Sequence, residues 1–217
     1  MIVTALLALA LAPTRQELSI PVREVLAVER LGVRRRSAVY TDALEAALAR
    51  GTFRTPVEGA LVQSAAGEER TWTRFEAADD GWFSGRPFRG GWAHATVDVP
   101  RSGAWRLDVA GHSAVLVDGA PRGGDIYSLG ITRLPLWLEA GQHELLFRCA
   151  RGRLRATLES APATVYLEEK DRTLPDILRG EAARLLLGVI VSNAGNQAAR
   201  GYSVLAHHAA GPATVSL

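Results

Sequence analysis

The chain has 217 residues, of which 47% are hydrophobic and 22% are charged, so it is long enough to bury one or two cores. Its net charge of +2 is too balanced to indicate nucleic acid or a membrane surface as a partner. The single cysteine, Cys149, excludes an intramolecular disulfide. Its alternation with Leu145 and Phe147 predicts a buried thiol that acts as a small hydrophobic side chain.

The N-terminus is apolar. Residues 2–12 contain no charged side chain and are too few to span a bilayer as a helix. This length is typical of the core of a signal peptide, with Ala8-Leu9-Ala10 as an A-x-A cleavage site. We therefore expect residues 1–12 to be a signal peptide and the protein to be secreted, either periplasmic or extracellular. An ordinary buried N-terminal segment is the alternative.

One helix is predicted, over residues 42–50, within an N-terminal extension that covers residues 13–69. Asp42 is placed to cap it, Glu45 follows three residues later as in a capping box, and Gly51 stops it. Leu44 and Leu48 share one face. Because so short a helix depends on docking for its stability, we expect it to pack against the edge of a sandwich.

The segment from residue 52 to residue 89 is rich in Gly, Pro and aromatic residues, and few regular strands are expected in it. Asp79 and Asp80 stand before Gly81, between two aromatic clusters. Adjacent carboxylates before a glycine are common in turns, but their hard oxygen atoms also make them candidate calcium ligands. The turn is the preferred interpretation, so no cofactor is predicted, and calcium is the alternative that the pattern leaves open.

Period-two alternation dominates the middle of the chain. Leu107 and Val109 alternate with polar residues, as do Leu145 and Phe147, and Asp118-Gly119 suits a tight turn between strands. Short strands at such spacing predict an antiparallel sandwich. The predicted fold class is mainly β, with a jelly-roll sandwich over residues 70–162.

After residue 162 the pattern changes. Strands are predicted over residues 164–167, 185–191, 202–206 and 214–217, with a loop over residues 171–178. We interpret residues 163–217 as part of a second, immunoglobulin-like β-sandwich. Such a domain needs roughly 100 residues, so we expect the chain to be a piece of a longer protein.

Five tryptophans favour a sugar-binding surface, because flat aromatic faces stack on sugars while carboxylates hold hydroxyls. Core packing is the preferred interpretation for any single tryptophan, and most clearly for Trp105, which alternates with Leu107 and Val109. Trp137 lies opposite apolar neighbours in the strand pattern, which would expose it, and Trp82 follows two acids. The long loop over residues 122–130 adds polar candidates. The candidate ligand-binding residues are Trp82, Trp137, Asp79, Asp80, Asp125 and Tyr127.

Motifs for catalysis are missing from the sequence. It contains no Walker loop, no GxGxxG, no HExxH and no Cys-x-x-Cys. Residues 111–115, Gly-His-Ser-Ala-Val, lack the final glycine of the G-x-S-x-G nucleophile elbow, and a strand pattern follows Ser113 where that motif needs a helix. No catalytic residue and no metal ligand set is therefore predicted.

Two segments carry a resemblance to a known family. Residues 115–119, Val-Leu-Val-Asp-Gly, and residues 136–147, Leu-Trp-Leu-Glu-Ala-Gly-Gln-His-Glu-Leu-Leu-Phe, resemble the galactose-binding-like and PA14-like jelly rolls. Asp118 stands where that family has asparagine, and His143 where it has Asn or His. Those positions shape turns, so the resemblance, over about residues 70–160, implies the fold and says little about the ligand.

A second resemblance is to N-terminal accessory regions of secreted bacterial hydrolases, including prolyl-oligopeptidase-like serine peptidases. It is prompted by residues 122–127, 134–136 and 171–176. It implies a catalytic domain downstream, because none of that family's catalytic residues can be placed on this chain.

The leading hypothesis is a non-catalytic, secreted accessory or binding module whose partner is carbohydrate. The alternatives are the front end of such a hydrolase, with that downstream domain as partner, and a purely structural interaction module. No nucleic acid and no membrane span are expected.

Overall fold

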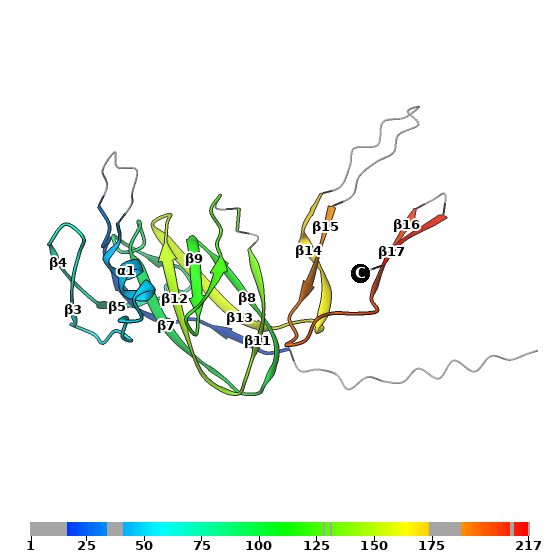
Figure 1. The fold of residues 1–217 in the computed structure, drawn as a ribbon, viewed down its shortest axis with the longest axis horizontal. Helices are drawn as coiled ribbons and strands as arrows, with labels where there is room; N and C mark the ends of the chain where they lie inside the picture. The colour runs from blue at the N-terminus through cyan, green and yellow to red at the C-terminus, as the bar shows by residue number, and fades with distance from the viewer. Residues whose placement is uncertain are drawn as a thin grey trace, which may run out of the picture.

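A computed structural model describes residues 17–33, 41–127, 129–130, 132–173, 188–208 and 211–216. The predicted signal peptide, residues 1–12, lies outside the described residues. The described part is mainly β, as predicted, with seventeen strands and one short helix. Figure 1 shows two sheets stacked face to face, and the strands of both sheets pair antiparallel.

The first sheet, sheet A, has the strand order β1-β13-β8-β11, and a short strand, β6, also pairs with β13. Its strands are β1 (Ser19–Pro21), β6 (Phe83–Ser84), β8 (Gly103–Ala110), β11 (Arg133–Leu138) and β13 (Arg153–Ser160). The second, sheet B, has the order β10-β9-β12-β7-β2-β5. Its strands are β2 (Glu24–Val28), β5 (Thr73–Glu76), β7 (Trp92–Val99), β9 (His112–Val117), β10 (Ala120–Gly123) and β12 (Gly141–Cys149).

The core fills the space between the two sheets. Alternate residues of each strand enter it, among them Leu107 and Val109 from sheet A, and Leu145, Phe147 and Cys149 from sheet B. All five are buried, which confirms the predicted alternation and the buried cysteine. Burial also raises the pKa of the Cys149 thiol, because the thiolate would lose its hydration.

The turn from β9 to β10 is as tight as the sequence predicts. Asp118 and Gly119 both have positive φ, +50° and +78°, which two-residue hairpin turns of type I′ require. The Asp118 carboxylate also accepts the backbone N–H of Glu144 on β12 at 2.9 Å, so the turn is tied to the neighbouring strand.

The helix α1 (Ala43–Ala49) forms where it is predicted, with Asp42 as its N-cap, accepting from the amides of Leu44 and Glu45. The predicted docking at a sandwich edge is wrong. Leu44 is buried in a cluster with Trp92 and Leu146, whose side chains project from the outer face of sheet B. The hairpin of β3 (Leu61–Gln63) and β4 (Glu69–Thr71) adds further cover through Val62 and Trp72.

The C-terminal part forms two hairpins. In the first, β14 (Val165–Thr173) pairs with β15 (Gly188–Asn193), and in the second, β16 (Ser203–His208) pairs with β17 (Gly211–Ser216). The predicted start of the loop at Asp171 is wrong, because β14 continues through Thr173 after a register shift. Within the described ranges each hairpin is a two-stranded sheet, and the second sandwich remains a prediction.

Candidate functional site

The outer face of sheet A carries charged side chains. They occupy the outward positions of the period-two pattern: Arg106 and Asp108 on β8, Arg133 on β11, and Arg155 and Glu159 on β13. Antiparallel register places these residues side by side, for example Arg106 opposite Glu159 and Arg133 opposite Asp108. The result is a surface on which carboxylates and guanidinium groups alternate.

A hollow of about 300 Å³ opens on this face, between β13 and the loop that precedes β6. Its polar lining consists of Arg23, Asp79, Asp80, Asp108, Arg155 and Glu159, together with Thr157. Two of the predicted binding residues, Asp79 and Asp80, therefore meet a third acid from β8. A hollow lined in this way offers several acceptors and two guanidinium donors to a polar ligand.

Trp82 adjoins this hollow but is not a free platform. The guanidinium carbon atoms of Arg153 and Arg155 lie 4.2 and 4.9 Å from its ring centroid, in cation–π contact. Its backbone N–H donates to the Asp80 carboxylate at 3.1 Å. This bond is the one expected if Asp79 and Asp80 form a turn. A sugar that stacks on Trp82 would first have to displace a guanidinium.

The other three predicted residues are not among those that line the hollow. Trp137, on β11, is 37% exposed as predicted, and its indole N–H donates to Glu139 at 2.8 Å. Asp125 is buried, and its carboxylate accepts the amides of Leu129 and Gly130, so its role is to hold its own loop. Tyr127 projects from that loop into solvent.

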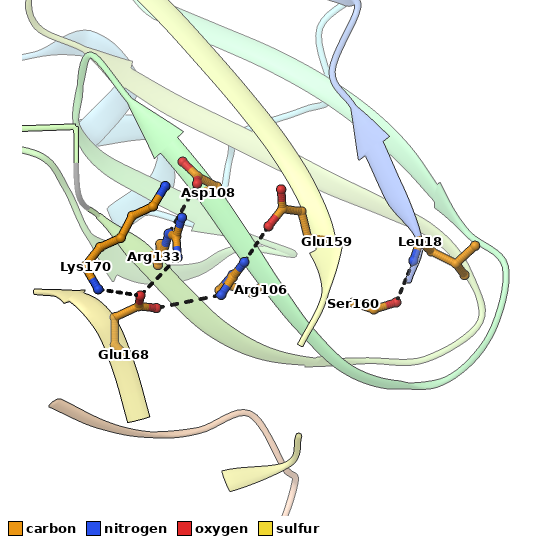
Figure 2. Close-up of polar contacts among 8 residues, drawn as sticks. All are labelled: Leu18, Arg106, Asp108, Arg133, Glu159, Ser160, Glu168 and Lys170. Carbon is orange, nitrogen blue, oxygen red and sulfur yellow. Dashed lines mark hydrogen bonds and ion pairs between the residues drawn. The ribbon is translucent and has the colours of Figure 1, made fainter. Parts of the chain in front are cut away.

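The other end of this face is organised by Glu168, a residue that sequence reasoning missed. Glu168 of β14 is buried, and Figure 2 shows its carboxylate between Arg133 and Arg106. It accepts from Arg133 at 3.0 Å and lies 4.0 Å from Arg106. Arg106 also binds Glu159 at 2.7 Å, and Arg133 lies 3.3 Å from Asp108. We call Glu168 with Arg106 and Arg133 the Glu168 clamp.

The clamp attaches the β14–β15 hairpin to the sandwich. Beside it, Tyr166 of β14 packs with Ala104 of β8, Ala161 and Ala194 in a small buried cluster. The hairpin stands next to β11 in Figure 1. The outer face of sheet A is thus divided into a part that holds the following segment and a part, with the hollow, that remains open.

In the part of the chain that the structure describes, no three His, Cys, Asp or Glu side chains converge as a metal site. Nor is any helix among these residues both long and apolar enough to cross a membrane. Comparisons with protein-family models, with curated proteins and with solved structures return no match.

Proposed function

We propose that this chain is a non-catalytic accessory module that binds carbohydrate in the hollow on the outer face of sheet A. The observation that carries the proposal is the convergence of Asp79, Asp80 and Asp108 with Arg155 in one open hollow. A sugar hydroxyl can both donate and accept a hydrogen bond, so carboxylates, which accept, and guanidinium groups, which donate, can recognise it together. Export follows from the apolar residues 2–12, which suit a signal peptide.

The strand order supports the proposed jelly roll. From β7 to β9 each strand crosses to the opposite sheet, β9 and β10 form a hairpin, and each strand from β10 to β13 crosses again. The first strand, β1, pairs with the last, β13. A jelly roll is also built from two four-stranded sheets, so these crossings support the proposal, with β2 and β5 as additions to one edge. This connectivity agrees with the resemblance to galactose-binding-like modules.

Titration of the chain with a panel of soluble oligosaccharides, followed by calorimetry, tests the proposal. For a sugar that binds, the double variant Asp79→Ala, Asp80→Asn is expected to lose at least about tenfold in affinity, because hydrogen bonds to charged groups contribute about 1.5–3 kcal/mol each. Trp137→Ala should bind as the wild type does, because Trp137 does not line the hollow.

The matched control is Asp98→Asn, which changes an exposed acid on β7 of the other sheet. It should leave affinity unchanged. Absence of binding to every sugar, or equal affinity of the Asp79/Asp80 variant and the wild type, would contradict the proposal.

A second candidate function is domain support, in which the sandwich positions a following domain. The Glu168 clamp favours it, because a buried acid between two arginines fixes the β14–β15 hairpin on sheet A. In this case the partner is the downstream catalytic domain of a secreted serine hydrolase. The two candidates use neighbouring parts of the same face, and Asp108 and Glu159 belong to both, because they line the hollow and also pair with Arg133 and Arg106 of the clamp.

A further inference from the structure

The loop between β10 and β11 exposes three large apolar side chains. Ile126, Tyr127 and Leu129 are 60%, 81% and 65% exposed. Large apolar residues scattered singly over a surface are ordinary, but a group on one loop marks a binding surface. We call these three side chains the apolar tip.

The loop is held in place by several contacts, so fraying does not account for this exposure. The buried Asp125 carboxylate accepts the amides of Leu129 and Gly130, at 2.8 and 3.0 Å. Arg151, from the turn between β12 and β13, donates to the Ile126 carbonyl at 2.6 Å. Gly124 lies so close to the Ser113 backbone that a Cβ there would meet it at 2.1 Å.

Arg151 contacts the loop that carries the apolar tip, and two further arginines lie close to this loop in sequence or to Arg151 in space. Arg122 precedes the loop on β10, Arg151 touches it, and Arg89 lies over Gly152 beside Arg151. All three are exposed, and among the described residues none of them forms an ion pair with an acid. The carboxylate of Asp125, within the loop, is buried and accepts two backbone amides. The overall charge balance therefore conceals a basic end of the sandwich.

We propose that the apolar tip docks this end of the sandwich onto an anionic membrane surface. Tyrosine and aliphatic side chains enter the boundary between headgroups and acyl chains, while the arginines bind lipid phosphates. The charge complementarity of three arginines without acidic partners favours an anionic lipid surface over a neutral one. This surface is separate from the proposed sugar site, because none of its residues lines the hollow.

Co-sedimentation of the full chain with phosphatidylcholine vesicles, with and without about 30% phosphatidylglycerol, tests this inference. Binding to the anionic vesicles and little binding to the neutral ones is expected, and added salt should weaken it. The variant Tyr127→Ser, Leu129→Ser should bind anionic vesicles at least about tenfold more weakly, because it removes the inserted apolar area. Arg89→Gln, Arg122→Gln should also weaken binding and reduce its salt dependence.

Two control variants match these changes in chemistry and exposure. Val57→Ser, Leu61→Ser removes two apolar side chains that are 66% and 63% exposed elsewhere, and Arg50→Gln, Arg54→Gln removes two exposed arginines. Both controls should bind as the wild type does. The inference is overturned if the chain ignores anionic vesicles at low salt, or if the tip variant binds them as well as its control does.

Discussion

The outer faces of the two sheets differ in chemistry. The outer face of sheet B is apolar and covered, since Val28, Trp92 and Leu146 are buried there under α1 and the β3–β4 hairpin. The outer face of sheet A is charged, with Arg106, Asp108 and other ionic side chains on its strands. Both sheets contribute to one core, so their inner faces are alike. The N-terminal extension therefore covers the outer face of sheet B, while it leaves the charged outer face of sheet A uncovered.

The largest expected effect comes from breaking the covered face. Trp92→Ala removes a buried indole that packs against Leu44 and donates to Asp42 at 3.2 Å. Its loss is expected to lower the free energy of unfolding by about 3–5 kcal/mol, the usual cost of a large core truncation. Chemical denaturation measures this change.

Trp137→Ala is the matched control, because Trp137 is also on an outer face but on sheet A, where it is 37% exposed. Its expected cost is about 1 kcal/mol or less, as for a surface residue. Equal costs for the two tryptophans would contradict the contrast between the faces.

The strands and the helix could be predicted because their signals are local. Alternation at Leu107 and Val109 needs no knowledge of partners, and Asp42 reads as a cap from its neighbours alone. The sequence also contains a signal for the covered face, but this signal is a departure from the alternation of apolar and polar residues. Leu145, Leu146 and Phe147 are three consecutive apolar residues, as expected of a strand that is buried on both faces.

The hollow and the clamp could not be predicted, because each depends on register between distant strands. Asp79 and Asp108 line the same hollow because β13 pairs with both β8 and β6, and the loop that carries Asp79 precedes β6. Glu168 stands in a charged stretch between the strand predicted over residues 164–167 and the loop predicted from residue 171. Its partners, Arg133 and Arg106, are 35 and 62 residues earlier. β14 extends through that stretch because its backbone pairs with β15.

The second expected effect is a dependence of stability on pH through His112. Its ring is fully buried and packs edge-on against Phe147. Burial lowers the pKa of His112 to about 4, against weaker opposing effects of the Gly123 backbone and Asp125. The unfolded chain binds this proton near pH 6.5, so stability is complete above that value and is lost as the pH falls toward 4. The loss amounts to about 3 kcal/mol, since each pKa unit corresponds to about 1.4 kcal/mol.

His112→Phe tests this by denaturation at several pH values. The variant keeps an aromatic ring of similar volume, so it should match the wild type within about 1.5 kcal/mol at pH 8. Its stability should fall less steeply than that of the wild type between pH 6.5 and pH 4. Parallel curves for the two proteins would show that His112 does not titrate as described.

The smallest expected effect concerns the charged face. Glu168→Gln keeps the shape of the side chain but leaves Arg106 and Arg133 without their shared buried carboxylate. Removing one member of a buried ion pair is costly, but both arginines retain a second acid, so we expect a loss of about 2 kcal/mol. The loss should be local, because a two-stranded hairpin such as β14–β15 has little stability of its own. Hydrogen exchange should therefore quicken at the amides of β14 and β15 while those of β8 and β13 stay protected.

Glu58→Gln, which breaks an exposed pair with Arg74, should change exchange nowhere in the hairpin. If the hairpin amides exchange at the same rate in Glu168→Gln as in the wild type, the clamp does not hold the hairpin, and domain support loses the observation that favours it.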